Sequence, residues 1–296
     1  MTHYIVAHEE KFGVEPICAT LEFAPATYYA ARRRPPSARQ VRDEQLKVEV
    51  RRVFEANRRV YGDDKIWTQL RREGTAVARC TVERLMRELG ISGCIRGKTV
   101  RTTWPNEVTS LPADLVDRHF RAEAPNRLWV CDITYVKTHS GWIYVAFVID
   151  VFSRRTIGWQ VSRSLRTDLA LDAQEMAMWA RRGASLSGLI HHSDRGGQYL
   201  AIRYTERLAE AGAVTSIGSR GDSYDNALAE SFHGLFKAEC IRKDGPWRGL
   251  DDVEYATLDY VDWFNHHRLH GEIGMVPPAE FEAAYHGNSP CVAVTQ

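Results

Sequence analysis

The order of β-rich and helical segments after residue 127 constrains the fold more than any other feature of this sequence. Three β-rich segments come first, followed by a helix, a strand, a helix, a strand and a last helix. In order, these segments are 128–136, 142–152, 155–161, 167–182, 189–192, 202–211, 213–217 and 226–240. β-Branched and aromatic residues mark the strands, and apolar residues at helical spacing mark the helices. The order predicts a mixed five-stranded sheet with helices on both faces.

This order is typical of the ribonuclease-H-like α/β fold. We expect it to form a core over residues 123–285, with a helical extension at its C-terminal end, followed by a tail at 286–296. A polar, proline-containing stretch at 97–122 is expected to be a linker. Residues 1–37 are expected to form a short helical segment that ends in an Arg- and Pro-rich linker.

Between the two linkers, residues 38–96 show three helical patterns, at 41–57, 63–72 and 79–89. Gly74 and Gly90 follow the second and third patterns and indicate helix ends. Two short amphipathic helices joined by a glycine-containing turn are typical of a helix-turn-helix DNA-binding domain. Arg79, Arg84 and Arg87 of the last helix would then contact DNA. The alternative is a small packing unit that touches no DNA.

Charge is divided unequally between the two halves of the chain. Residues 1–110 hold 20 Lys and Arg against 14 Asp and Glu, whereas residues 111–296 hold 19 against 24. A basic front half suits phosphate contact and an acidic back half suits metal binding, although charged faces are often only solvated. The six cysteines include no C-x-x-C pair and are expected to be reduced thiols. No segment resembles a secretory signal or a membrane span, so we expect a cytoplasmic protein without a membrane partner.

Three carboxylates on separate elements are the candidate catalytic residues. Asp132 interrupts the apolar strand 128–133, where an ionised side chain is costly unless it is paired, binds a metal or points to solvent. Asp194 follows the strand 189–192 and precedes two glycines, at a strand end where ligands often bind; a plain turn residue is the alternative. Glu230 lies on the helix 226–240, about 200° around from the position of Leu228 in its apolar stripe. Alone it would be read as a solvated glutamate.

Together, the three carboxylates can hold two Mg²⁺ ions, because hard cations prefer oxygen ligands. Two such ions about 3.5–4 Å apart can activate an attacking hydroxyl and stabilise the oxygen that leaves a phosphodiester. Mn²⁺ is a possible substitute. This chemistry needs no nucleophilic serine or cysteine. Lys237 shares the helix face of Glu230 and would contact a DNA phosphate, unless it is only a surface lysine.

The spacing of these carboxylates resembles the DD(35)E pattern of transposases and retroviral integrases. Sixty-one residues separate Asp132 from Asp194, and 35 separate Asp194 from Glu230. The strings at 129–135, 192–196, 224–232 and 264–270 narrow the resemblance to one group of bacterial insertion-sequence transposases. Its members are made from two overlapping frames, and this chain is similar to the second-frame (OrfB) product. Tyr61-Gly62, the string at 84–90 and Pro277-Pro278-Ala279 extend the resemblance over most of the chain.

The resemblance implies a Mg²⁺-dependent enzyme in which Asp132, Asp194 and Glu230 are catalytic metal ligands. Such an enzyme cuts the ends of its insertion sequence to free a 3′-hydroxyl, which then attacks target DNA. The expected partners are element ends, target DNA, further copies of this chain in a homo-oligomer, and the first-frame (OrfA) product. Two alternatives stay open: a nuclease of the same fold that only hydrolyses DNA, and a DNA-binding regulator derived from an inactive element.

Secondary site residues carry two interpretations each. His192 orients Asp194 or contacts DNA, or it is a packed core histidine. Asn226 contacts DNA or caps its helix. Arg268 and His270 touch DNA or pack against the core helices, and the sequence does not decide between these roles. The glycine-containing loop 218–223 is expected to be mobile until DNA binds.

Overall fold

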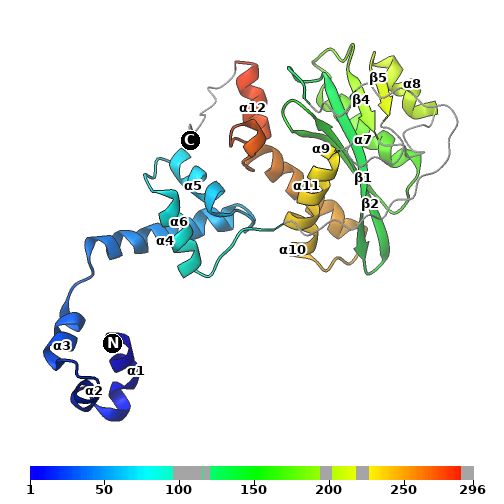
Figure 1. Cartoon of the computed structure of the whole chain (residues 1–296). Coiled ribbons are helices and arrows are strands. Elements are labelled where there is room, and N and C mark those ends of the chain that lie inside the picture. The colour runs from blue at the N-terminus through cyan, green and yellow to red at the C-terminus, as the bar shows by residue number, and fades with distance from the viewer. Residues whose placement is uncertain (96–115, 117–120, 194–201, 218–226, 288–296) are drawn as a thin grey trace. The chain divides into compact units, whose positions relative to one another are not determined.

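The computed structural model describes residues 1–95, 116, 121–193, 202–217 and 227–287 (Figure 1). The chain divides into two compact units, residues 1–51 and residues 52–296. The boundary falls inside helix α4 (Ala38–Ala56), which is therefore shared by the two units. Each unit has its own buried side chains and is described separately.

The first unit contains three short helices ahead of α4: α1 (Thr2–Phe12), α2 (Val14–Thr20) and α3 (Pro25–Arg33). Their small core consists of Ile5, Ile17, Cys18 and Tyr28. The Tyr28 hydroxyl donates a hydrogen bond to Glu9, which also pairs with Arg32. The prediction of a helical N-terminal segment is confirmed.

The second unit begins with the end of α4, followed by α5 (Asp63–Arg72) and α6 (Arg79–Glu88). Ile66 and Leu70 of α5 and Val82 and Leu85 of α6 are fully buried, at the spacing of one helical face. Gly74 and Gly90 adopt φ values of 86° and 67° after the two helices, a backbone conformation that favours glycine. The three predicted helices of this region are confirmed.

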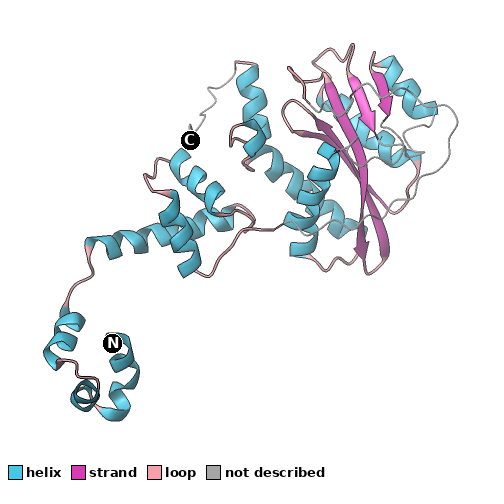
Figure 2. Ribbon diagram, in the orientation of Figure 1, coloured by secondary structure: helices cyan, strands magenta, loops and turns pink. Residues whose placement is uncertain are grey.

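The rest of the second unit is built on a five-stranded sheet in the order β3-β2-β1-β4-β5 (Figure 2). The strands are β1 (Leu128–Thr138), β2 (Gly141–Asp150), β3 (Thr156–Ser162), β4 (Ile190–Ser193) and β5 (Val214–Ile217). β1, β2 and β3 form an antiparallel meander, whereas β4 and β5 run parallel to β1. The predicted mixed sheet is confirmed.

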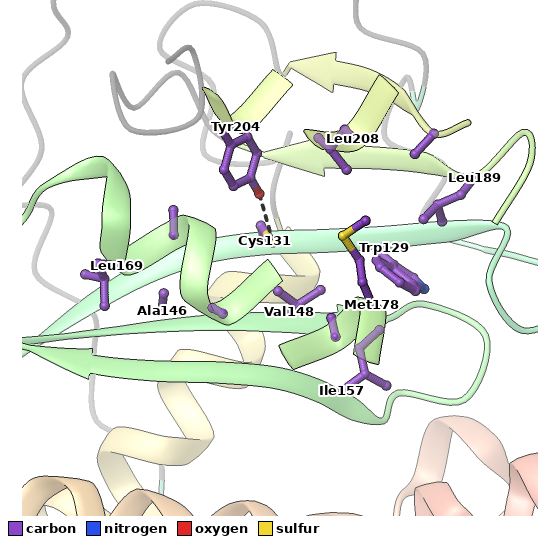
Figure 3. Close-up of a cluster of buried hydrophobic side chains, with 14 residues drawn as sticks. Trp129, Cys131, Ala146, Val148, Ile157, Leu169, Met178, Leu189, Tyr204 and Leu208 are labelled. Carbon is purple, nitrogen blue, oxygen red and sulfur yellow. Dashed lines mark hydrogen bonds between the residues drawn. The ribbon is translucent and has the colours of Figure 1, made fainter. Parts of the chain in front are cut away.

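One face of the sheet packs against α7 (Thr167–Ala180) and α8 (Ile202–Glu210). Figure 3 shows the apolar cluster on this face, in which Trp129 and Cys131 of β1 meet Ala146 and Val148 of β2. The cluster is completed by Ile157 and by side chains of both helices. Because β-strand side chains alternate, the residues between these, Asp132 among them, belong to the opposite face.

The opposite face packs against α9 (Ala227–Phe236) and α11 (Leu250–His266). Phe147 of β2 contacts Phe232 and Phe236 of α9, at ring-centroid distances of 4.8 and 5.1 Å. A π-helical turn, η2 (Lys237–Ile241), and the short α10 (Arg242–Asp244) continue from α9, where the sequence predicted an uninterrupted α-helix. A 3-10 turn, η3 (Gly271–Ile273), and α12 (Pro278–Tyr285) complete the described chain.

Two further predictions concern membrane-spanning helices and the state of the cysteines. Within the described residues, no helix is both long enough and apolar enough to cross a membrane. Cys18, Cys80, Cys94, Cys131 and Cys240, the five cysteines in the described part of the chain, are free thiols. The prediction of reduced cysteines is confirmed for these five.

Candidate catalytic carboxylate site

Asp132 lies in the middle of β1, on the sheet face that packs against α9. Its side chain is 16% exposed. The Oδ1 atom accepts a hydrogen bond from the backbone N–H of Ile133 at 2.8 Å, and the Oδ2 atom lies 3.3 Å from Nδ1 of His233 on α9. The carboxylate is therefore only partly exposed to solvent, as expected of a metal ligand at the edge of a hydrophobic core.

Glu230 lies in the first turn of α9, on the helix that covers Asp132. It is exposed, whereas Leu228, Phe232, Leu235 and Phe236 are buried as the apolar stripe predicts. His233 follows Glu230 by three residues, so the two side chains lie on neighbouring positions of one helix face. The contact between His233 and Asp132 thus brings the start of α9 toward the middle of β1.

Sequence reasoning missed His233. The signal was available, because the positions three and seven residues after Glu230 share its helix face. Of the two residues on this face, only Lys237 was identified from the sequence. His233, which lies between Glu230 and Lys237, was not. A histidine next to an apolar stripe gains significance only when the element opposite is known, and the sequence does not show that Asp132 faces this helix.

Lys237 begins the π-helical turn and is half-buried. Its Nζ atom lies 4.5 Å from the centroid of the Tyr135 ring on β1. Burial lowers the pKa of Lys237, Arg242 acts in the same direction, and the charge of Asp132 opposes both. Its ammonium group therefore lies within electrostatic range of the Asp132 carboxylate.

Asp194 and Asn226, two further predicted site residues, lie outside the described residues, as does the loop 218–223. His192 is described, and its ring is fully buried. Its Nδ1 atom lies 3.0 Å from the Ser216 hydroxyl on the neighbouring strand β5. A ring enclosed between strands does not reach DNA. The burial of His192 favours the alternative of a packed core histidine over DNA contact, and an orienting role toward Asp194 stays a prediction.

Five residues of the C-terminal string 264–270 are also buried, whereas His266 and His267 are exposed. Arg268 is 5% exposed and forms an ion pair with Glu239, 2.6 Å between Nη2 and Oε1. Nη1 of Arg268 lies 3.3 Å from Nε2 of His270, which is also buried. Asn265 accepts a hydrogen bond from Thr156 N–H and donates one to the Thr156 carbonyl, at 2.9 and 2.8 Å. The open choice for Arg268 and His270 is resolved in favour of packing.

The three arginines predicted to contact DNA lie on the surface of α6. Arg84 pairs with Glu88 and Arg87 with Glu83, each four residues away on the same helix. Arg79 lies 3.6 Å from Asp64 at the start of α5. Exposed pairs of this kind contribute about 0.3–0.5 kcal/mol, so a phosphate can replace the acidic partner at little cost.

The described part of the site fits a hard divalent cation in its chemistry. Asp132 and Glu230 supply carboxylate oxygens from two packed elements, and neither cysteine nor an accessible imidazole nitrogen competes with them. Among the described residues, no group of three or more His, Cys, Asp and Glu side chains forms a metal cluster. Asp194, the third predicted ligand, lies outside the described residues.

Family models match nearly the whole of the second unit. An "HTH-like domain" model matches residues 40–99, and two "Integrase core domain" models match residues 122–223 and 211–278. The first covers α4 to α6 and the other two cover the sheet with its helices.

Relatives are similar along almost their entire length. The putative transposase for insertion sequence element IS986/IS6110 of Mycobacterium tuberculosis is 54% identical over 269 residues, which cover 90% of this chain and 97% of that protein. The transposase for insertion sequence element IS629 of Shigella sonnei is 51% identical over 94% of each protein. A simian T-cell lymphotropic virus intasome chain shares 14% identity and a TM-score of 0.48, covering 80% of this chain and 74% of that one; this similarity is too low to support an inference.

The chain belongs to the insertion-sequence transposases with an integrase core domain. It is accordingly an enzyme of the polynucleotidyl transferase class that acts on DNA. The ribonuclease-H-like core preceded by a helix-turn-helix region, as expected from the sequence, is the architecture of this family.

Proposed function

We propose that this transposase cuts the ends of its insertion sequence and joins them to target DNA at a site formed by Asp132, Asp194 and Glu230. The parallel register of β1 and β4 carries the proposal. It pairs Cys131 with Ser193. In the sequence, Asp132 directly follows Cys131 and Asp194 directly follows Ser193. Since neighbouring strands lie about 4.8 Å apart, the residues that precede the two aspartates lie side by side. Packing of α9 on β1 supports the third ligand, Glu230.

In this proposal the three side chains hold two Mg²⁺ ions, which would supply charge neutralisation and hydroxyl activation when bound; Mn²⁺ can substitute. Asp132 and Glu230 contribute oxygen ligands from a rigid strand and a packed helix. In the first step a water oxygen bonds to phosphorus while the bond to the 3′ oxygen breaks, leaving a 3′-hydroxyl on the element end. In the second step that hydroxyl attacks a target phosphodiester and displaces the target's own 3′ oxygen.

Conservative amide substitutions test the three roles. Asp132→Asn, Asp194→Asn and Glu230→Gln each remove a charged ligand with little change of volume. With labelled element ends and Mg²⁺, we expect cleavage to fall at least about 1,000-fold, since groups that act as one unit lose most activity when any one is removed. Binding of the same DNA should change little. Glu254→Gln, at an exposed position of α11, is the matched control and should cleave normally.

The same assay separates the open alternatives. Joined products with the unaltered chain support a transposase, whereas hydrolysis without joining would indicate a nuclease of the same fold. Full cleavage by Asp194→Asn would refute the assigned ligand set. Neither reaction, with DNA binding retained, would indicate a regulator derived from an inactive element.

We further propose a division of the chain into an N-terminal segment and linker (1–37), a DNA-binding domain (38–96), a linker (97–122), the catalytic core with its extension (123–285) and a tail (286–296). The contact residues proposed within it are Arg79, Arg84 and Arg87 of α6, together with Lys237 and Asn226 near the carboxylates. The exposure of Arg79 and Arg87, the partial exposure of Arg84 and the weakness of these surface ion pairs support the assignment for α6.

Salt dependence tests the α6 contacts. Each phosphate contact contributes about 0.9 to the slope of log affinity against log salt concentration. We expect Arg84→Ala and Arg87→Ala each to lower that slope by about one unit while weakening binding to element ends. Arg182→Ala, at an exposed position after α7 where the guanidinium stacks on Trp179, is the control. Unchanged slopes in both α6 variants would show that this helix faces away from DNA.

The assembly proposed is a homo-oligomer, because two element ends must be held together for joint insertion. A first-frame (OrfA) product is a proposed additional partner, as the group that this sequence resembles is made from two frames. The cellular site proposed is the cytoplasm, where bacterial DNA lies. Light scattering of the chain with and without paired element ends tests the oligomer directly.

A further inference from the structure

We propose that His233 is a positioning residue that fixes the orientation of the Asp132 carboxylate for metal binding; this inference rests on the proposed function. Nδ1 of His233 lies 3.3 Å from Oδ2 of Asp132, and the Ile133 N–H bonds Oδ1 at 2.8 Å. With a backbone N–H bonded to one oxygen and an imidazole nitrogen beside the other, rotation of the carboxylate about its last side-chain bond is restrained. The lone pairs that these two groups leave open are those available to a cation.

The imidazole itself is held on the side away from the carboxylate. His233 is 8% exposed, and its ring lies 5.8 Å from the ring of Phe147 and 6.3 Å from that of Phe232. Phe147 is the cross-strand partner of Asp132 in the β1–β2 ladder. The Asp132 carboxylate, the His233 imidazole and the Phe147 ring therefore pack together and join β1, β2 and α9. The histidine cannot move unless Phe147, the cross-strand partner of Asp132, moves with it.

The two ring nitrogens have different surroundings. Nε2 is buried and has no hydrogen-bond partner within the described residues, whereas Nδ1 faces the carboxylate. A tautomer with its proton on Nδ1 can present that proton to Asp132, and it leaves an acceptor rather than a donor unpaired in the core. A ring directed in this way cannot be a metal ligand itself, because Nδ1 is occupied and Nε2 is enclosed. His233 therefore acts through Asp132.

Replacement of His233 by asparagine, glutamine or phenylalanine in the full chain tests this role. The side-chain nitrogen of asparagine can reach the position of Nδ1, whereas that of glutamine reaches the position of Nε2. We expect His233→Phe and His233→Gln to weaken Mn²⁺ binding about 10-fold, the usual effect of removing a group that orients a ligand, and His233→Asn to retain most of it. Binding is measured by the loss of the free Mn²⁺ signal in electron spin resonance, without DNA and without turnover.

The same proteins are compared in thermal unfolding without metal, where His233→Phe should stay folded because its ring fits among Phe147 and Phe232. If it does not fold, the Asn and Gln pair carries the test alone. His266→Phe is the matched control, since His266 also bonds a neighbour through Nδ1 but is exposed on α11. Its Mn²⁺ affinity should be that of the unaltered chain.

Two results would overturn the inference: wild-type Mn²⁺ affinity in both His233→Phe and His233→Gln, or a loss in His233→Asn as large as in the other two. Asp132→Asn distinguishes this failure from failure of the proposed function. If Asp132→Asn also binds Mn²⁺ normally, the ligand assignment itself fails. If it loses binding while the His233 variants keep it, only the positioning role fails.

Discussion

The buried histidines of β4 show how a single side chain can set the response of the whole core to pH. His191 is 1% exposed, and its Nε2 atom lies 3.2 Å from the Cys131 sulfur and 3.1 Å from the Tyr204 hydroxyl. Burial lowers the pKa of His191 to about 3, and the adjacent His192 acts in the same direction. The ring is therefore neutral in the folded protein at any pH at which the protein is handled.

This burial predicts acid sensitivity. An unfolded histidine titrates near pH 6.5, so between about pH 6.5 and 3 the unfolded chain binds one more proton at this site than the folded chain. The free energy of unfolding should thus fall with decreasing pH, by up to about 1.4 kcal/mol per pH unit from this group alone. Urea unfolding of the unaltered chain and of His191→Gln between pH 7 and 4.5 checks it. Equal slopes in the two proteins would contradict the prediction.

Individual candidate residues stand out in the sequence to unequal degrees. Asp132 does, because a carboxylate inside an apolar strand is costly and therefore conspicuous. His192 was only narrowed to alternatives, since a histidine at a strand end can face either the core or a ligand. His233 and Arg268 depend on which residues lie opposite, Asp132 in one case and Glu239 in the other. Pairings over such sequence distances are set by packing, which local patterns do not encode.

At the scale of elements, the close approach of α7 to β3 depends on one residue without a side chain. A Cβ atom added to Gly158 would lie 2.1 Å from the Ala173 carbonyl oxygen and 2.9 Å from the Ala177 backbone nitrogen. Both are backbone atoms of a helix in the middle of the apolar cluster, so neither can move without moving α7. Gly158 thus sets the distance between the sheet and this helix.

Gly158→Ala should therefore destabilise the core, by about 1–3 kcal/mol or more, the range found for overpacked sites. Chemical unfolding followed by tryptophan fluorescence, to which Trp129 in the same cluster contributes, measures the change. Gly183→Ala is the matched control, because an added Cβ there meets no atom within 4 Å. Its free energy of unfolding should stay within about 0.5 kcal/mol of the unaltered chain. A fully stable Gly158→Ala protein would show that α7 can shift outward freely.

Helices and strands were predictable because each carries its own period. The expected segment 63–72 coincides with α5, and 167–182 overlaps α7, which ends at Ala180. One start differs: α4 begins at Ala38 rather than at 41, directly after Ser37, whose hydroxyl accepts a hydrogen bond from the Gln40 N–H. The π-helical turn after α9 lies within a segment whose apolar spacing is that of an ordinary helix, so periodicity alone could not reveal it.

At the scale of the second unit, the helix-turn-helix region is joined to the catalytic core through the string 264–270, most of which is buried. The Tyr61 hydroxyl, between α4 and α5, donates to the His267 carbonyl at 3.0 Å and accepts from Leu269 N–H at 2.8 Å. Arg58 pairs with Asp244 and Asp259, and Arg72 pairs with Glu280. Residues near both ends of the unit thus form one junction, although the sequence patterns placed them in separate domains.

Removal of one oxygen atom at this junction should therefore affect both regions. Tyr61 is 1% exposed, so Tyr61→Phe leaves the Leu269 N–H and the His267 carbonyl without their partner in a dry setting, at a cost of about 1–3 kcal/mol. We expect amide hydrogen exchange to speed up together in residues 58–72 and 267–270 of the full chain. Tyr29→Phe is the control, because the Tyr29 hydroxyl bonds Glu15 at an exposed site and its loss should change exchange only locally. If only one of the two segments loses protection in Tyr61→Phe, the junction does not couple them, and DNA bound at α6 would have no rigid path to the carboxylates through this hydroxyl.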